Sequence, residues 1–209
     1  MKLLISICLF LLATPYCQSQ IEANAAYIKL SGGSVLFGTG DIPGFGIYVE
    51  GSGNVFKKNK YLSKHLQTGM ELYFESGVKN PTVINPTPDE FSHDPFFNHI
   101  SQIGIDFKST FYPFRKFLKG INIGIGAGCI FSFNSYEGRA VREVYTSTLS
   151  RRMSELRFEN RFLLGYRISV GYDVFIMKGQ LLVGVRTDLA NLNNGDYNQL
   201  IGAKIGYRF

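Results

Sequence analysis

The most regular feature of the chain is an unbroken alternation of apolar and polar positions over its last ten residues. One parity holds Ile201, Ala203, Ile205, Tyr207 and Phe209, and the other holds Leu200, Gly202, Lys204, Gly206 and Arg208. Successive side chains of a strand point to opposite faces of its sheet, so the pattern predicts a strand with one apolar face and one face rich in glycine and charge. Strands that lie between lipid and a polar lumen have this pattern.

The same two-residue period recurs along the chain and predicts eight strands. They span about 25–36, 44–54, 64–77, 100–113, 120–134, 158–176, 180–189 and 198–209. An even number of strands puts both ends of a barrel on one side, where short turns are expected, with longer loops on the other side. Residues 114–119 and 177–179 fit periplasmic turns, and 78–99 and 135–157 fit outer loops. The predicted fold is all-β, a single transmembrane antiparallel up-and-down barrel.

Side-chain volume indicates which face of the strands points inward. Alternation alone does not decide, because turning every strand over preserves it. The interior of an eight-stranded barrel is only just wide enough for side chains to fill it. The polar face is rich in glycine and the apolar face in Phe, Tyr, Ile and Leu, so the polar face is expected inside. The exterior would then be apolar over an area that only lipid tolerates, with Phe111, Phe114, Phe117, Tyr207 and Phe209 as an aromatic girdle.

The first 19 residues read as an export signal, which leaves residues 20–209 as one barrel domain. Lys2 precedes the apolar run from Leu3 to Ala13, which is shorter than the roughly 20 residues of a spanning helix. A cut after Ser19 is expected. A lipoprotein anchored at Cys17 is the alternative, although bulky Tyr16 stands where such signals need a small residue. Removal of the signal leaves Cys129 as the single thiol, which excludes a disulfide framework or a cysteine metal site.

The charge and the histidines of the chain limit the partners and cofactors that can be expected. The net charge of +6 is scattered along the chain, so no nucleic-acid partner is expected, and lipopolysaccharide phosphate is the better match. His65 and His93 have no metal-ligating partners at a useful spacing, and no metal or other cofactor is predicted.

Twelve charged residues share the lumenal parity, six of each sign, and we expect them to form a paired network. They are Lys29, Glu50, Glu71, Glu75, Asp106, Lys108, Arg167, Asp173, Arg186, Asp188, Lys204 and Arg208. An unpaired ion in a narrow, poorly hydrated space is expensive, so the balance predicts a plugged lumen. The alternative is a narrow channel with these charges as its selectivity filter. The eight-stranded width argues against that alternative.

The chain resembles the small outer-membrane barrels of the OmpA/OmpX type, especially the porin-family barrels common in Bacteroidetes. The resemblance rests on the alternating strands, on Phe111-Tyr112-Pro113-Phe114 and on Gly202 to Phe209. It implies that the barrel-assembly machinery recognises the last strand, with Tyr207 and Phe209 as the assembly signal. It implies no shared substrate.

The two long loops are the expected sites of partner binding. Residues 78–99 carry four prolines among acidic and aromatic residues. Residues 135–157 hold strand-like stretches on both sides of Ser147-Thr148, which predict a hairpin that projects beyond the membrane and whose edge could accept another strand. Its arginines could meet lipopolysaccharide phosphates or pair with neighbouring glutamates.

One alternative function is enzymatic. His99 and Ser101 share the lipid-facing parity at the outer end of a strand, where a histidine could act as base for a serine nucleophile. The segment from Phe97 to Gln102 resembles the His-x-Ser-Asn motif of outer-membrane lipid A deacylases, and the resemblance implies those two roles. Gln102 stands in place of the asparagine, and no glutamate follows to orient His99. The sequence therefore favours a non-enzymatic envelope protein that acts through its outer loops or as a subunit of a larger complex.

Overall fold

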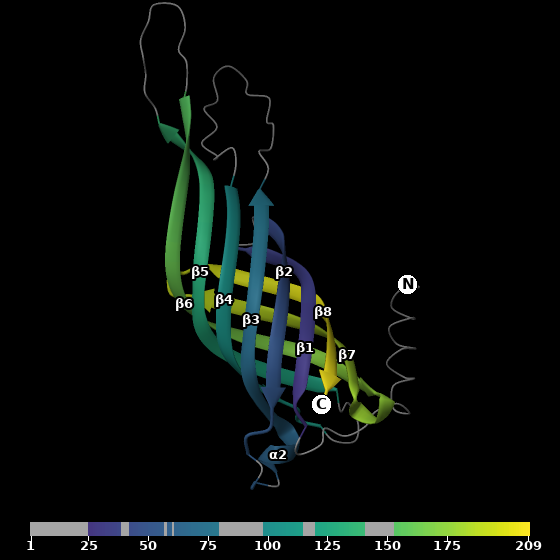
Figure 1. Ribbon diagram of the computed structural model, residues 1–209. Helices are drawn as coiled ribbons and strands as arrows, with labels where there is room; N and C mark the ends of the chain where they lie inside the picture. Colours follow the sequence, from purple (N-terminus) through teal and green to yellow (C-terminus); the bar gives the residue numbers. More distant parts are fainter. Residues whose placement is uncertain are drawn as a thin grey trace, which may run out of the picture.

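Eight antiparallel strands form a closed barrel in which each strand pairs with its neighbours in sequence and β8 pairs with β1 (Figure 1). The computed structural model describes residues 25–38, 42–56, 58–59, 61–79, 98–114, 120–140 and 153–209. The strands are β1 (Tyr27–Phe37), β2 (Ile42–Gly53), β3 (Leu66–Lys79), β4 (Asn98–Phe111), β5 (Ile121–Ala140), β6 (Met153–Ile176), β7 (Leu181–Leu192) and β8 (Tyr197–Arg208). The predicted eight-stranded up-and-down barrel is confirmed.

Strands β5 and β6 show the largest differences from the predicted lengths. Residues 135–140 belong to β5 and 153–157 to β6, whereas the sequence pattern predicts both segments as parts of a loop. The register of the two strands is continuous as far as Ala140 opposite Met153. Beyond Tyr136, β5 has β6 as its one described partner, because the pairing with β4 ends at Asn98 opposite Tyr136. A second difference is the four-residue helix α2 (Leu62–His65), which includes the first two residues of the predicted strand 64–77.

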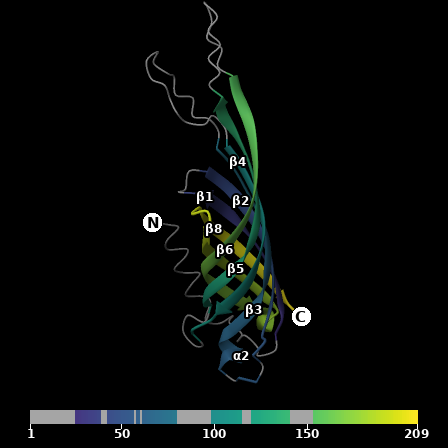
Figure 2. The ribbon, with the colours of Figure 1, turned by 90° about the vertical axis from the view of Figure 1, so that its left-hand side faces the viewer.

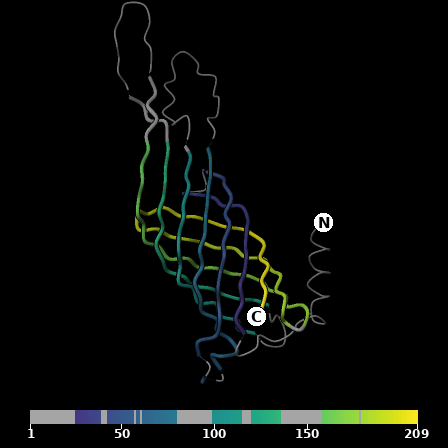
Figure 3. The backbone as a smooth tube through the Cα atoms, in the orientation of Figure 1, coloured from purple at the N-terminus to yellow at the C-terminus, as the bar shows by residue number. Residues whose placement is uncertain are grey.

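The barrel has two different ends. At the terminus end lie residue 25 and the C-terminus, and Phe209 N donates to Ala26 O at 3.2 Å. At the loop end, β5 and β6 rise above β7 and β8, and Figures 1 and 2 show them as the tallest part of the described barrel. The backbone trace shows the slanted rim that results from these unequal strand lengths (Figure 3).

The two faces of the strands differ as the volume argument predicted. Along β1, Lys29 and Ser31 are buried, whereas Ile28 and Leu30 are about half exposed on the outside. The same alternation continues around the barrel, so the interior collects charged residues and glycine and the exterior collects large apolar side chains. The polar face of the strands therefore points into the barrel, and the apolar face forms its outer surface.

The interior also contains apolar side chains, gathered at its two ends. The loop-end cluster consists of Val35, Phe37, Ile42, Tyr48, Tyr73, Ile130, Leu163, Leu192 and Leu200. The terminus-end cluster consists of Ala25, Tyr27, Tyr112, Phe175 and Leu182. In the latter, the ring of Phe175 lies 6.2 Å from that of Tyr27 and 6.1 Å from that of Tyr112, centroid to centroid. The charged groups therefore lie between two buried apolar clusters.

The turn between β2 and β3 packs against the terminus end. The Asn59 side-chain oxygen accepts hydrogen bonds from the N–H groups of Tyr61 (3.0 Å) and Leu62 (3.1 Å), which satisfies donors at the start of α2. His65 is buried, with Nδ1 2.6 Å from the Tyr112 carbonyl oxygen. His65 thus ties this turn to the end of β4. In the described part of the chain, no helix is long and apolar enough to cross a membrane.

Candidate functional site

Arg167 organises the part of the charged interior nearest the loop end. Its guanidinium reaches Glu75 Oε1 at 3.0 Å and Asp106 Oδ2 at 3.2 Å. Its central carbon lies 4.4 Å from the centroid of the Tyr73 ring and 5.2 Å from that of Tyr48, within the range of cation–π attraction. The guanidinium is thus held by carboxylates at its edge and by aromatic rings at its face.

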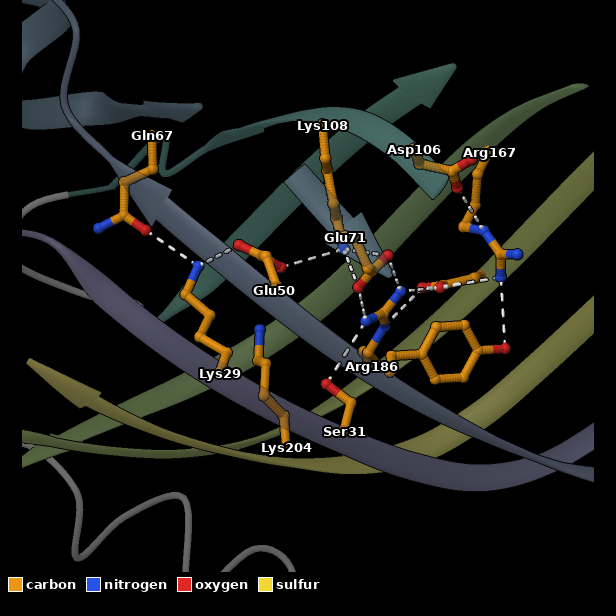
Figure 4. A network of polar contacts seen from close by, with 12 residues as sticks. Lys29, Ser31, Glu50, Gln67, Glu71, Asp106, Lys108, Arg167, Arg186 and Lys204 are labelled. Carbon is orange, nitrogen blue, oxygen red and sulfur yellow. Dashed lines mark hydrogen bonds and ion pairs between the residues drawn. The ribbon is translucent and has the colours of Figure 1, made fainter. Parts of the chain in front are cut away.

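Arg186 is the second centre of the network. It binds both carboxylate oxygens of Glu71, with Nη2 at 3.0 Å from Oε2, and both oxygens of Asp188, with Nε at 3.0 Å from Oδ1. Asp188 also lies 3.6 Å from Arg167 Nη1. One carboxylate therefore joins the two arginines, and Figure 4 shows the two guanidinium groups, with Arg167 joined to Asp106 and Arg186 joined to Glu71.

Lysines extend the network toward the terminus end. Lys108 Nζ lies 3.3 Å from Glu71 Oε1 and 3.4 Å from Glu50 Oε2, and Lys29 Nζ lies 2.7 Å from Glu50 Oε1. Lys29 also donates to Gln67 Oε1 at 3.0 Å (Figure 4). Alternating charges thus run without interruption from Glu75 to Lys29.

A separate pair closes the terminus end of the interior. Lys204 Nζ lies 2.7 Å from Asp173 Oδ1, and the Tyr112 hydroxyl donates to Asp173 Oδ2 at 2.8 Å. Burial, with a further contribution from the Asp173 carboxylate, raises the pKa of Tyr112 well above its ordinary value. The phenol therefore keeps its proton and remains a donor to Asp173.

The structure buries eleven of the twelve predicted lumen charges, five cations and six anions, and leaves Arg208 half-buried at the terminus end. Removing one member of such a network leaves its partners as unpaired charges in a low-dielectric space, and this lowers the free energy of unfolding by several kcal/mol. The arrangement is therefore suited to holding the interior closed and rigid.

Three uncharged lumen residues also belong to the network, although the sequence analysis selected only charged residues for it. Tyr48 donates to Glu75 Oε1 at 2.5 Å, and Asn198 donates to Glu75 Oε2 at 2.8 Å. Tyr73 stacks on Tyr48 with ring centroids 5.5 Å apart. All three have lumenal parity in their strands, so the face on which each lies was available from the sequence. The contacts depend on the β2–β3 register and, for Asn198, on the closure of the barrel, which brings β8 near β3.

His99 and Ser101 lie on the outer surface of β4, next to a serine that sequence reasoning did not select. His99 Nε2 is 3.2 Å from Ser101 Oγ and 3.2 Å from Ser76 Oγ, and the two hydroxyl oxygens are themselves 3.2 Å apart. Ser76 stands directly opposite Ser101 in the β3–β4 register. Ser76 could have been predicted as the third member only from the register of β3 against β4.

The loop end carries the second candidate site, the hairpin of β5 and β6. Strand β6 pairs with β5 from Met153, but with β7 only from Gly165 onward. Its outer surface is aromatic, with the rings of Phe131 and Phe162 in an edge-on contact at 5.0 Å and Phe158 three-quarters exposed. Most of the predicted loop sites 78–99 and 135–157, namely residues 80–97 and 141–152, lies outside the described residues, as do the signal segment, His93 and Phe117.

Comparison with known proteins identifies the fold class. No protein-family model matches the sequence, and no curated protein is similar to it in sequence. Among solved structures, Neisserial surface protein A superposes with a TM-score of 0.52 at 10% identity, covering 88% of this chain and 97% of that one. Weaker superpositions reach Ail of Yersinia pestis (TM-score 0.45, 11% identity, 90% and 100% coverage) and the N-terminal barrel of Pseudomonas aeruginosa OprF (0.39, 10%, 89% and 98%). The chain has the fold of the small eight-stranded outer-membrane barrels.

Proposed function

We propose that this chain is an integral outer-membrane protein with a plugged lumen that works by binding a partner at its loop end. The observation that carries the proposal is the β5–β6 hairpin, which continues beyond the rest of the barrel as ordered strand. The lumen supports a structural role, because its charges are buried and paired.

The outer surface supports the membrane location. Large apolar side chains such as Leu30, Ile47, Leu72, Phe107 and Ile125 are about half exposed or more, and they come from five different strands. Soluble monomers rarely expose contiguous apolar patches larger than a few hundred Å². We infer export by the segment 1–19, assembly through Tyr207 and Phe209 by the barrel-assembly machinery, contact with lipopolysaccharide, and kinship with the porin-family barrels of Bacteroidetes.

The plugged lumen makes a prediction about conductance. The purified barrel reconstituted in a planar lipid bilayer will give no unitary current, because paired charges and two apolar clusters occupy the interior. The narrow-channel alternative predicts steps of current that change in Arg186→Glu. Such steps in the wild-type protein, altered in that variant, would contradict the plugged lumen.

The partner-binding role is tested by shortening the hairpin. Replacing residues 132–161 by a short turn removes the projection together with most of the part of β6 that extends beyond β7, and leaves the pairs from Phe131 with Phe162 to Ile121 with Tyr172 intact. The wild-type protein extracted from its own outer membrane in mild detergent should migrate as a stoichiometric complex, and the shortened protein as a lone barrel. Equal native masses for the two proteins would refute a binding role for the hairpin.

A second candidate function, hydrolysis of an acyl ester in the outer leaflet, is favoured by the triangle of Ser76, His99 and Ser101. Ser101 Oγ would attack the ester carbonyl while His99 Nε2 takes the serine proton and passes it to the departing alkoxide. Water, deprotonated by the same histidine, would then release the fatty acid and restore the serine. The Ser76 hydroxyl is near enough to Ser101 to donate to the carbonyl oxygen of the substrate.

The esterase candidate predicts a change in lipid A. Cells that express the wild-type protein should contain lipid A lacking an acyl chain in mass spectra, and Ser101→Ala should restore the complete form. Ser109→Ala is the matched control, since Ser109 lies on the same outward face of β4 but close to its terminus end. Unchanged lipid A alongside strong wild-type expression would remove this candidate and leave the binding role unaffected.

A further inference from the structure

Strand β6 has an edge that no described residue pairs with as a strand. Over Met153–Leu164 its other edge is joined to β5, whereas β7 begins to pair only at Gly165. The cause is the early end of β7 at Leu192, where the chain turns into β8 through Gly195 with φ +87°. Figure 1 shows β6 standing clear of the lower strand β7 at the loop end.

The peptide groups that face this edge can be identified. Asn193 N donates to Leu164 O at 2.9 Å, and the Asn193 side-chain oxygen accepts from Leu164 N at 3.2 Å, so the groups of Leu164 point to the β7 side. Residues of an antiparallel strand alternate in the side to which they bond, and the β5–β6 register has no bulge. Ser154, Leu156, Phe158, Asn160 and Phe162 therefore direct their N–H and C=O groups to the edge. Asn193 caps only the residue where the edge begins.

Three features that natural sheets use to prevent strand addition are absent from this edge. Residues 153–164 include no proline and no lysine, and their register with β5 has no bulge. One face of the exposed strand presents Phe158 and Phe162, and the other presents Glu159 and Arg161, which form a salt bridge at 2.7 Å. The strip thus offers backbone groups that no described strand pairs with, between an aromatic face and a face that carries both charges.

We propose that this edge binds an extended segment of another protein, which adds to the sheet as a strand beside β6. The proposal rests on the binding role proposed above and specifies its partner. An extended backbone presents acceptors and donors at the same alternating spacing as the edge of a strand, so it can replace the water on this edge along its whole length. The incoming segment should alternate apolar residues, which pack on Phe158 and Phe162, with polar or charged residues that face Glu159 and Arg161. A second copy in the same membrane does not fit. Two identical edges pair antiparallel only about a two-fold axis perpendicular to the strands, whereas two copies in one membrane are related by an axis along the membrane normal.

The first test is a proline at the edge. Asn160→Pro removes one N–H that faces the edge and keeps the bonds between β5 and β6, which are made by the neighbouring residues. Asn160→Thr is the matched control, because it changes the side chain and keeps the N–H. In native-mass measurements on protein extracted from its own outer membrane, wild type and Asn160→Thr should be stoichiometric complexes, and Asn160→Pro a lone barrel with normal heat-modifiable migration.

The second test is residue-resolved amide hydrogen exchange, which reports strand addition directly. In the complex, the amides of Phe158, Asn160 and Phe162 should exchange at least about tenfold more slowly than in the separated barrel, because they become hydrogen-bonded. The amides of Glu159 and Arg161 should be slow in both samples, since they already bond to β5. A uniform change along the strand, or none, would contradict strand addition.

The outcomes separate this proposal from the binding role itself. A complex that survives in Asn160→Pro without alternating protection overturns strand addition while the binding role stands. A lone barrel in the wild type overturns both. A complex whose mass is a multiple of the chain's own mass, with no other protein in it, shows that a second copy is the occupant and overturns the partner proposed here.

Discussion

Replacing Arg186 with methionine will lower the free energy of unfolding of the barrel by about 3–5 kcal/mol. The guanidinium contacts both oxygens of Glu71 and both oxygens of Asp188, and all three side chains are buried. Methionine keeps much of the volume and removes the charge, so two carboxylates lose their main partner in a space with little water. The measurement is equilibrium urea unfolding of the barrel refolded into lipid vesicles, extrapolated to zero denaturant.

Arg161→Met is the matched control for this prediction. Arg161 also forms a salt bridge, at 2.7 Å to Glu159, but both side chains of that pair are about 40% exposed on the projecting hairpin. Solvent screens such a pair, and its loss should cost less than about 1 kcal/mol. If Arg186→Met destabilised the barrel no more than Arg161→Met does, the buried network would not be what holds the interior together.

The second large effect is expected at Gly128, where β5 passes close to β4. A Cβ at this position would meet the Ile105 carbonyl oxygen and lie 2.7 Å from the Asp106 Cα, and both are backbone atoms that cannot turn aside. Gly128→Ala should therefore cost about 1–3 kcal/mol of unfolding free energy, as overpacking does in other cores. The same urea titration measures it.

Gly126→Ala, two residues away on the same face of the same strand, is the control. There the Cβ would have its nearest neighbour, the Phe107 carbonyl oxygen, at an ordinary 3.5 Å. Alanine at such a site restricts the unfolded chain and should be neutral or stabilising by up to about 1 kcal/mol. Equal effects at the two positions would mean that the close approach of β4 and β5 is not the constraint.

The accuracy of the sequence prediction depends on what surrounds each strand. Residues 198–209 lie between an apolar exterior and a charged interior, so their alternation placed the strand within one residue of β8. The described ends of β5 and β6, near Ala140 and Met153, pair only with each other, and their sequence lacks the regular alternation that marks the other strands, so the pattern predicts a loop there.

Contacts between strands could not be predicted from the sequence alone, because they depend on the register. Parity placed His99 and Ser101 on the outer face of β4, but the third member, Ser76, depends on the β3–β4 register. In the same way, parity selected Arg167 and Arg186 for the lumen, whereas Asp188 as their shared carboxylate depends on the β6–β7 register. The alternation of apolar and polar positions shows which face of a strand each side chain lies on, and the register between strands determines which side chains it contacts.

The native mass of the protein, extracted from its own outer membrane in mild detergent, tests the central claim most directly. A barrel that works through the free edge of its β5–β6 hairpin should leave the membrane in a stoichiometric complex with another protein and should separate from it when the hairpin is shortened. A wild-type protein that emerges as a lone barrel of its own mass would contradict the account.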